Sequence, residues 1–339
     1  MTEAASPSVP AERARILAIA NQKGGVGKTT TAVNLATALA ASGKRVLIVD
    51  ADPQGNASTG LGIEGEARRT GTYQVLIGDA RLADAAQPAL VPDMRVVPAT
   101  VDLLAAELEL VGEPRREYRL RDALSGVDRD YEYILIDCPP SLGLLTLNAL
   151  VAADGVLVPL QCEFYALEGL SHLMQTVECI RAAFNARLQL SGIVLTMYDR
   201  RNNLCELVAA DVRRHLGGTV YDTVIPRNVK VSEAPSHGKP VLLYDVRCAG
   251  SQAYIHLASE LLRRERAAAA PGPEPAPAAE DVGAGEPALT EANAESGNTT
   301  SDNATSGSGG DGAVAPAAGA DGEARPAVEP DPGKGGGDG

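Results

Sequence analysis

Residues Lys23–Thr30 combine residue types that can hold the phosphates of a nucleotide. The segment lies between an apolar run at 15–20 and a helical pattern at 28–41. Glycines let consecutive backbone N–H groups turn toward one anion, and the N-terminus of a helix adds partial positive charge. We therefore expect Lys28 to contact the β- and γ-phosphates and the Thr29 hydroxyl to ligate Mg²⁺. The other predicted nucleotide contacts in this phosphate loop are Gly24, Gly25, Val26, Gly27 and Thr30.

The phosphate loop also contains a second lysine, Lys23, directly before its glycines. The usual pattern would have a glycine at position 22, where this chain has Gln22. Since Lys28 is enough for the phosphates bound by its own chain, we expect Lys23 to serve a second subunit. The alternative is a glycine-rich turn with solvated lysines, which the eight-residue pattern between a strand and a helix disfavours.

Acidic residues end two further apolar runs. The run at 45–50 ends in Asp50 and continues to Asp52, and the run at 132–137 ends in Asp137. In a parallel sheet, ligands collect outside the carboxyl ends of the strands, so both segments should meet the phosphate loop. A carboxylate at the end of an apolar strand can bind Mg²⁺ directly or through water. Each aspartate alone is equally compatible with a helix N-cap, but the three segments together favour a nucleotide site.

Short apolar runs alternate with helical patterns through most of the chain. The strands are predicted at 15–20, 45–50, 94–98, 132–137, 155–160, 191–196 and 219–225. The helices are predicted at 28–41, 101–110, 117–125, 142–152, 167–184, 203–216 and 252–266. This alternation predicts an α/β fold, with a doubly wound, mostly parallel sheet covered by helices on both faces. Residues 53–93 are less regular, and a surface insertion is predicted there.

The net charge of −14 is unevenly distributed. Residues 267–339 contain 13 acidic and two basic residues, a net charge of −11, which leaves −3 for residues 1–266. Residues 197–266 contain 11 basic and eight acidic residues. The segment 267–339 is rich in Ala, Gly, Pro and acidic residues and has no aromatic residue, so we expect it to be a disordered tail. The predicted organisation is a flexible segment at 1–13, an ATPase-type domain at 14–266 and this acidic tail.

Other features of the composition favour a cytoplasmic protein. Five cysteines show no paired spacing, no apolar run reaches membrane-spanning length, and the first ten residues lack a secretion signal. We therefore expect reduced thiols and no membrane partner.

Four segments resemble the deviant Walker A ATPases of the ParA/Soj type, which partition chromosomes and plasmids. They are KGGVGKTT at 23–30, VDADPQGN at 49–56, IDCPPSLG at 136–143 and IPRNVKVSEAPSHGKP at 225–240. The resemblance extends from about Arg15 to Arg266 and implies a P-loop ATPase fold and an ATP-dependent homodimer. It also implies Mg²⁺ as cofactor, non-specific binding of double-stranded DNA on the nucleoid, and stimulation by a ParB/Spo0J-type partner.

The resemblance also implies roles for single residues. Lys23 matches the lysine that reaches the partner subunit's phosphates, and with Lys28 and Asp52 it completes the predicted catalytic set. Asp52 matches the acid that positions the attacking water, and Asp137 matches the Walker B acid that binds Mg²⁺. Pro226 and Asn228 match positions beside the nucleotide base.

Residues for DNA contact follow from the same resemblance. Arg201 matches a DNA-contacting arginine of Soj-type proteins, Lys230 lies where a second basic contact is common, and Arg200 precedes Arg201 in the same loop. The alternative is a solvated charged loop.

Four rival functions find less support in the sequence. A MinD-like membrane-cycling ATPase needs a basic amphipathic C-terminal helix, which residues 267–339 do not provide. A tyrosine kinase with the same loop would need a C-terminal tyrosine cluster, whereas the last tyrosine is Tyr254. An iron–sulfur protein of this kind would need a dedicated cysteine pair. A DNA-binding module without hydrolysis would lack Lys28 or Asp52.

Overall fold

The apolar runs of the sequence form one mostly parallel sheet. We describe residues 13–269 from a computed structural model, in which eight strands follow the order β3-β4-β2-β5-β1-β6-β7-β8. The strands are β1 (Arg15–Ile19), β2 (Val46–Asp50), β3 (Gln87–Pro88), β4 (Met94–Val97), β5 (Tyr133–Asp137), β6 (Gly155–Gln161), β7 (Gln189–Tyr198) and β8 (Val220–Pro226). All neighbouring pairs are parallel except β3 and β4. The predicted α/β fold class is confirmed.

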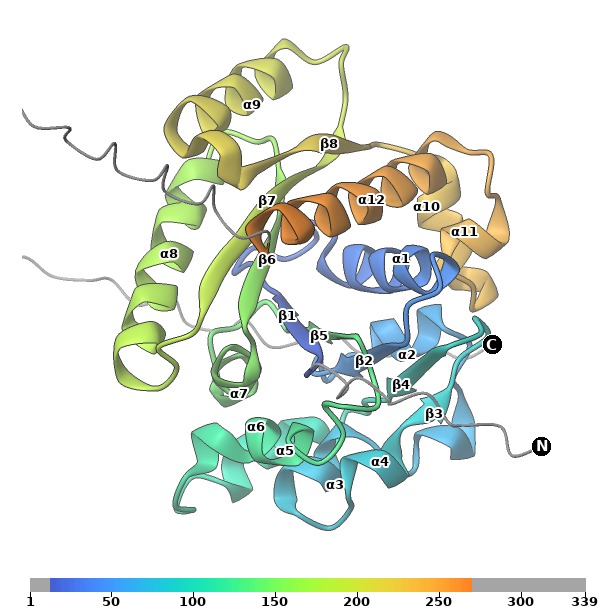
Figure 1. Ribbon diagram of the computed structural model, residues 1–339, viewed down its shortest axis with the longest axis vertical. Helices are drawn as coiled ribbons and strands as arrows, with labels where there is room; N and C mark the ends of the chain where they lie inside the picture. Colours follow the sequence, from blue (N-terminus) through green and yellow to red (C-terminus); the bar gives the residue numbers. More distant parts are fainter. Residues whose placement is uncertain (1–12, 270–339) are drawn as a thin grey trace, which may run out of the picture. The chain divides into compact units, whose positions relative to one another are not determined.

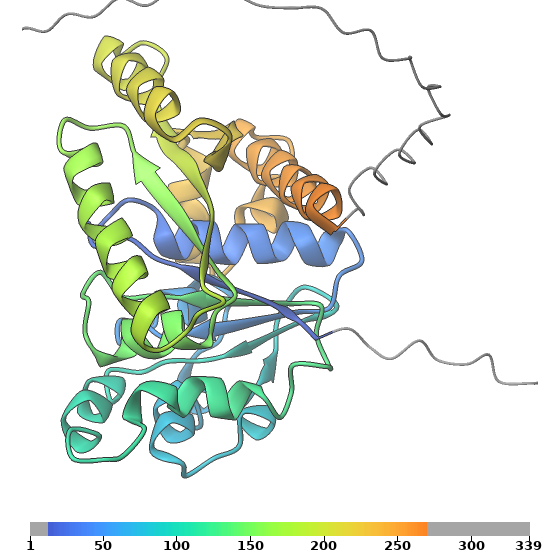
Figure 2. The same ribbon diagram turned by 60° about the vertical axis from the view of Figure 1, so that its left-hand side comes forward.

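Helices cover both faces of this sheet (Figure 1). The longer helices are α1 (Lys28–Ala41), α5 (Leu103–Glu109), α7 (Leu144–Ala152), α8 (Ala166–Ala183), α9 (Asn203–Leu216) and α12 (Ala249–Ala269). The shorter ones are α2 (Asn56–Gly60), α3 (Thr72–Ile77), α4 (Leu82–Ala85), α6 (Arg119–Leu124), α10 (Val229–Glu233) and α11 (Val241–Tyr244). Four 3₁₀ turns complete the described elements: η1 (Gly65–Arg68), η2 (Arg116–Tyr118), η3 (Gly217–Thr219) and η4 (Ala234–His237). Figures 1 and 2 show α1 and α12 on one face and α7 and α8 on the other.

The two faces of the sheet bury separate hydrophobic cores. Along β5, Ile134 and Ile136 join the core beneath α7 and α8, while Tyr133 and Leu135 join the core beneath α1 and α12. This alternation is the two-residue period of a strand, here with apolar side chains on both faces. Each fully buried aliphatic side chain stabilises the fold by about 1.5–3 kcal/mol. The sheet is therefore a rigid platform for the loops at the carboxyl ends of its strands.

Residues 53–93 differ from the sequence prediction. They form α2, η1, α3, α4 and β3, and Leu61, Leu76 and Leu82 are at most 2% exposed. The prediction of a surface insertion is therefore wrong. These elements contain two to six residues each, which is too short for a helical or alternating pattern to show clearly in the sequence.

The two edges of the sheet differ in length. On one side β3 contains only two residues, one of which is Pro88, and it pairs with β4 in the antiparallel direction. On the other side β8 contains seven residues and packs against α12. The buried carboxylate of Glu260 in α12 accepts hydrogen bonds from the backbone N–H groups of Asp222 and Thr223, each at 2.9 Å. This contact fixes α12 along the edge strand.

Parts of the predicted organisation lie outside the described residues. Nearly all of the N-terminal segment at 1–13 and of the acidic tail at 267–339 falls there, and α12 continues to Ala269, three residues past the predicted boundary. Among residues 13–269, no helix combines the length and the apolarity that crossing a membrane requires.

Candidate active site

The phosphate loop connects β1, near the centre of the sheet, to α1. Gly25 and Gly27 adopt positive φ angles of 73° and 87°, which only glycine adopts without strain. A Cβ atom at Gly24 or Gly25 would meet no atom within 4 Å, so this side of the loop is open. Gly27 caps α1 without a side-chain hydrogen bond, which leaves N–H groups of the first helical turn available to an anion.

Lys28 lies inside the curve of the loop. Its ammonium group donates to the backbone carbonyl of Lys23 at 3.0 Å, and the residue is only 7% exposed. Burial lowers the pKa of Lys28, and the nearby Asp137 carboxylate counteracts this effect. Thr196 in β7 donates from its hydroxyl group to the carbonyl of Val26 at 2.8 Å and so fixes the loop against the sheet. The lysine is therefore held in the position from which it can contact a bound phosphate.

Asp50 and Asp137 end neighbouring strands and lie opposite each other in the register of β2 and β5. Both are completely buried. The Asp50 carboxylate accepts hydrogen bonds from the N–H and the hydroxyl group of Ser58, at 2.8 and 2.7 Å, and burial raises the pKa of Asp50 to about 6. Asp50 therefore organises the segment that follows β2.

Neither carboxylate oxygen of Asp137, in contrast, has a hydrogen-bond partner of ordinary geometry, although the Thr29 hydroxyl group lies near enough to lower the pKa of this carboxyl group. Burial raises the pKa of Asp137 well above its usual range, and the carboxylate of Asp50 raises it further. A buried carboxylate without partners costs several kcal/mol unless a counter-charge is supplied. A divalent cation would supply that charge, so the arrangement fits the predicted metal site.

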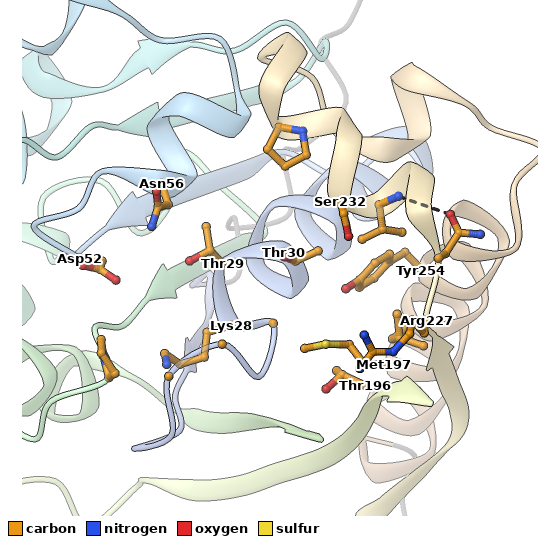
Figure 3. A pocket seen from close by; sticks show the side chains of 18 of the residues that line it. Lys28, Thr29, Thr30, Asp52, Asn56, Thr196, Met197, Arg227, Ser232 and Tyr254 are labelled. Carbon is orange, nitrogen blue, oxygen red and sulfur yellow. Dashed lines mark hydrogen bonds between the residues drawn. The ribbon is translucent and has the colours of Figure 1, made fainter. Parts of the chain in front are cut away.

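Asp52 lies two residues beyond the end of β2 and is 7% exposed. Its carboxylate accepts a hydrogen bond from the N–H of Gln54 at 3.0 Å. In Figure 3, Asp52 faces the same space from the loop after β2 as Lys28 and Thr29 do from the first turn of α1. This arrangement allows Asp52 to act on a group held by the phosphate loop.

A cavity of about 560 Å³ extends from these residues toward β8. It contains Gly24, Gly25, Gly27, Lys28, Thr29, Thr30, Asp52, Pro226 and Asn228 among its lining residues, whereas Lys23, Val26 and Asp137 do not line it. The side-chain oxygen of Asn228 accepts from the N–H groups of Lys230 and Val231, at 2.9 and 3.4 Å, and caps α10. Its side-chain amide nitrogen is therefore the group that remains for a ligand.

Sequence reasoning missed several residues of the cavity wall. Asn56 follows Asp52 closely and could have been included with it. Thr196, Met197 and Tyr254 come from β7 and α12, far along the chain, and Figure 3 shows Met197 and Tyr254 at the end away from Asp52. No local pattern marks these three positions, because they reach the cavity only in the folded chain, where α12 packs against α1 and Thr196 of β7 bonds to the phosphate loop.

Lys23 does not line the cavity. Its ammonium group forms an ion pair with the carboxylate of Glu163, which follows β6, and both side chains are about two-fifths exposed, at 43% and 41%. The second lysine of the loop is therefore available at the surface and held by a partner of opposite charge.

The residues predicted to contact DNA lie at a second hollow. This arginine groove, of about 750 Å³, lies between the loop after β7, strand β8 and the first half of α12, and it is lined by Arg200, Arg201 and Arg227. Arg201 is bound by Asp199 through two side-chain hydrogen bonds at 3.0 and 2.8 Å, which lower the pKa of Asp199 to about 2. Within residues 13–269, Arg200 and Arg227 form no ion pair.

Lys230 is not part of this groove. It lies in α10, where its ammonium group pairs with Glu233 at 2.9 Å. The structure therefore groups Arg200 with Arg201 and adds Arg227, but it separates Lys230 from them.

Comparisons with known proteins agree with this geometry. A family model described as an AAA domain matches residues 14–190. The chromosome partitioning protein ParA of Caulobacter vibrioides is 64% identical over 254 residues, which cover 74% of this chain and 95% of that protein. The sporulation initiation inhibitor protein Soj of Bacillus subtilis is 54% identical over 247 residues, covering 73% and 98%.

Solved structures show the same fold. A Mycobacterium smegmatis protein described as cobyrinic acid a,c-diamide synthase, with bound ATP analogue and magnesium, is 38% identical, with a TM-score of 0.66 over 75% of this chain and 97% of that one. The cell division ATPase MinD of Pyrococcus furiosus is 28% identical, with a TM-score of 0.62 over 74% and 99%.

Proposed function

The chain belongs to the ParA/Soj family of chromosome-partitioning ATPases, and from this premise we propose that it is an ATP-controlled switch that binds DNA as a dimer. It is an ATPase with a mostly parallel P-loop fold. One observation carries the mechanistic proposal: Lys28, Thr29 and Asp52 meet at one cavity beside a buried carboxylate, Asp137, that lacks a hydrogen-bond partner of ordinary geometry.

ATP and Mg²⁺ fit this cavity. Thr29 and Asp137 would hold the cation, whose chemistry is to neutralise negative charge on the phosphates. Within residues 13–269, no group of three or more His, Cys, Asp or Glu side chains is placed to hold a metal ion alone. The other ligands would therefore be phosphate oxygens and water, as is usual for Mg²⁺ bound with a nucleotide. The 38% identical neighbour with bound ATP analogue and magnesium supports this choice.

The residues of the cavity have different roles in the hydrolysis of ATP. The N–H groups of the loop and the ammonium group of Lys28 bind the phosphates and stabilise the charge that develops during transfer. Asp52, held by the N–H of Gln54, orients the water that attacks the terminal phosphate. Pro226 and Asn228 flank the base end of the cavity. Hydrolysis by one chain alone is expected to be slow, and we propose that a ParB-type partner accelerates it.

Lys23 makes the dimer depend on the nucleotide. Because it does not line its own cavity and pairs with Glu163 instead, its proposed contribution to ATP binding is contact with the phosphates of a second subunit. A ligand shifts an equilibrium only through contacts that differ between the two states, and this contact exists only in the ATP-bound dimer.

DNA binds, in this proposal, to the arginine groove of each subunit. Arg200, Arg201 and Arg227 present guanidinium groups to backbone phosphates, with Lys230 nearby along the chain. Among the helices of residues 13–269 no recognition helix is apparent, so binding should not depend on base sequence. Such an ATP-bound dimer would associate with the nucleoid and leave it after hydrolysis.

The test is DNA binding under three nucleotide conditions, measured by fluorescence anisotropy on two unrelated duplexes. We expect binding to both duplexes with ATP and Mg²⁺, and little binding with ADP or without nucleotide. Equal affinity with ADP and ATP would contradict the switch. A tenfold or greater preference for one duplex, on the scale of base readout, would contradict non-specific binding.

A further inference from the structure

Lys23 and Glu163 come from two loops that leave the same edge of the sheet. Lys23 lies in the phosphate loop after β1, and Glu163 lies in the loop between β6 and α8. Because β1 and β6 are parallel neighbours, both loops begin at the carboxyl ends of adjacent strands. The ammonium group of Lys23 pairs there with the carboxylate of Glu163, and among residues 13–269 neither side chain has another charged partner. This ion pair joins the phosphate loop to the segment that precedes α8.

The backbone of Lys23 is held by buried groups. The side-chain oxygen of Asn21, which is 5% exposed, accepts a hydrogen bond from the N–H of Lys23 at 3.0 Å. The side-chain nitrogen of Asn21 donates to the carbonyl of Pro159 in β6 at 2.8 Å. The carbonyl of Lys23 accepts from the ammonium group of Lys28 at 3.0 Å. Since both backbone groups are occupied, the freedom left to Lys23 is in its side chain, whose end is held by Glu163.

The backbone of Glu163 is held in a similar way. Its N–H donates to the carbonyl of Gln161, and its own carbonyl accepts from the N–H of Ala166 at the start of α8, each at 2.9 Å. The ion pair therefore joins two long side chains on fixed backbones, and both side chains are partly exposed. Exposed side chains change rotamer rapidly, so this pair can open and close without a change of the fold.

The ion pair and the proposed dimer compete for the same ammonium group. Each subunit of the dimer contributes one Lys23, so two of these ion pairs have to open when two subunits associate. The released carboxylate of Glu163 also leaves negative charge within reach of the same lysine, on the side from which the phosphates of the second subunit approach. Like charges repel, so both effects favour the monomer.

We propose that Glu163 is a positioning residue for Lys23, which holds this side chain to its own subunit and so raises the protein concentration at which ATP-bound dimers form. The inference rests on the proposed function, because it takes Lys23 as the contact between subunits. Exposed ion pairs are weak, whereas charge-assisted hydrogen bonds to phosphate are strong. The pair therefore sets a threshold for dimerisation and does not prevent it.

The experiment compares the full-length chain with Glu163→Gln, which removes the charge and keeps the shape of the side chain. Light scattering over a range of protein concentrations, with ATP and Mg²⁺, measures the dimer dissociation constant. This constant should fall by about 2- to 30-fold, the worth of two exposed ion pairs per dimer. The gain should shrink as the salt concentration rises, because salt screens exposed charges.

Glu178→Gln is the matched control. Glu178 pairs with Arg181 in the second half of α8, and these side chains are 53% and 48% exposed. The control removes one negative charge, as Glu163→Gln does, but leaves Lys23 paired. Its dimer dissociation constant should equal that of the native chain, and a gain as large as that of Glu163→Gln would overturn the inference.

Two further measurements separate this role from a general effect on structure. With ADP, Glu163→Gln should stay monomeric, because the contact made by Lys23 requires ATP in the second subunit. The affinity of the monomer for a fluorescent ATP analogue should be unchanged, since neither Lys23 nor Glu163 lines the cavity. Dimers with ADP, or a dimer with ATP that is no tighter than that of the native chain, would overturn the positioning role.

The ion pair itself can be tested without reference to the dimer. Melting temperatures of the nucleotide-free Lys23→Ala, Glu163→Gln and double variants form a double-mutant cycle. The double variant should lose less stability than the sum of the two single losses. Losses that simply add would show that the two side chains do not interact and would overturn the inference. If the native chain formed no dimer with ATP, the proposed function would fail, while this cycle would still decide whether Glu163 holds Lys23.

Discussion

Replacing Lys23 by alanine should separate dimerisation from nucleotide binding. Lys23 does not line its own cavity, so a monomer should bind ATP nearly as well as before. In the proposed dimer each subunit gives one lysine to the other subunit's phosphates, and the variant loses both contacts. A hydrogen bond to a charged group contributes about 1.5–3 kcal/mol, so two contribute about 3–6 kcal/mol. The dimer dissociation constant should therefore rise by about 10²- to 10⁴-fold.

Folding should be affected much less than dimerisation. The variant loses the ion pair with Glu163, and because both side chains are about two-fifths exposed, that pair is worth about 0.2–1 kcal/mol. The melting temperature should fall by at most about 3 °C in a domain of this size. Lys44→Ala is the matched control, since Lys44 forms a similar ion pair with Glu132 before the amino end of β2, away from the loop.

Sizing chromatography with light scattering, run with ATP and Mg²⁺ at matched protein concentrations, measures the dimer. Binding of a fluorescent ATP analogue measures the monomer site. Wild type and Lys44→Ala should both dimerise with ATP. A Lys23→Ala protein that dimerises at the wild-type concentration would refute the role given to this lysine.

Three further predictions concern the other charged residues. Asp52→Ala should stop phosphate release in a coupled ATPase assay but leave ATP-dependent DNA binding, and wild-type turnover would contradict its role. Asp137→Asn should abolish Mg²⁺-dependent hydrolysis yet raise the melting temperature of the nucleotide-free protein at pH 7. The pKa of Asp137 is raised in the folded protein, so folding is favoured most below about pH 4, the pKa of an unfolded aspartate, and becomes less favourable as the pH rises. A lower melting temperature of Asp137→Asn at pH 7 would refute this reasoning. Arg227→Ala should flatten the slope of log DNA affinity against log salt concentration by about two units per dimer. Arg201→Ala should flatten it by less, because Asp199 already neutralises Arg201. Equal slopes for wild type and Arg227→Ala would exclude Arg227 from the DNA interface.

Sequence patterns predicted the central part of the fold well. The strands at 45–50 and 132–137 are dense in Val, Ile and Leu, as buried parallel strands must be, and α1 has the predicted bounds of 28–41. The short elements α2, α3 and α4 were not predicted, since they contain too few residues for a period to show. Their apolar side chains are buried by contacts with elements distant in sequence, such as those of α3 with α5 and α6 and of α2 with α1.

The residues of the candidate site could be predicted where they lie together in one short segment of the sequence. The phosphate loop, Asp52 and Asp137 each lie in a short recognisable segment. The partners of these residues were not predictable, because Glu163 lies 140 positions from Lys23 and Thr196 lies 170 positions from Val26. Asn228 shows a different limit, because its side-chain oxygen caps α10, a role that the sequence interpretation had not given to it.

The two-residue strand β3 affects how readily crowded molecules can aggregate through a sheet edge. A long free strand edge is a template onto which another molecule can add its own strand, and repeated addition leads to fibres. Here the edge strand β3 offers only two residues, and Pro88 has no N–H group to donate. Molecules present at high local concentration would therefore find little at the β3 edge on which to add a further strand.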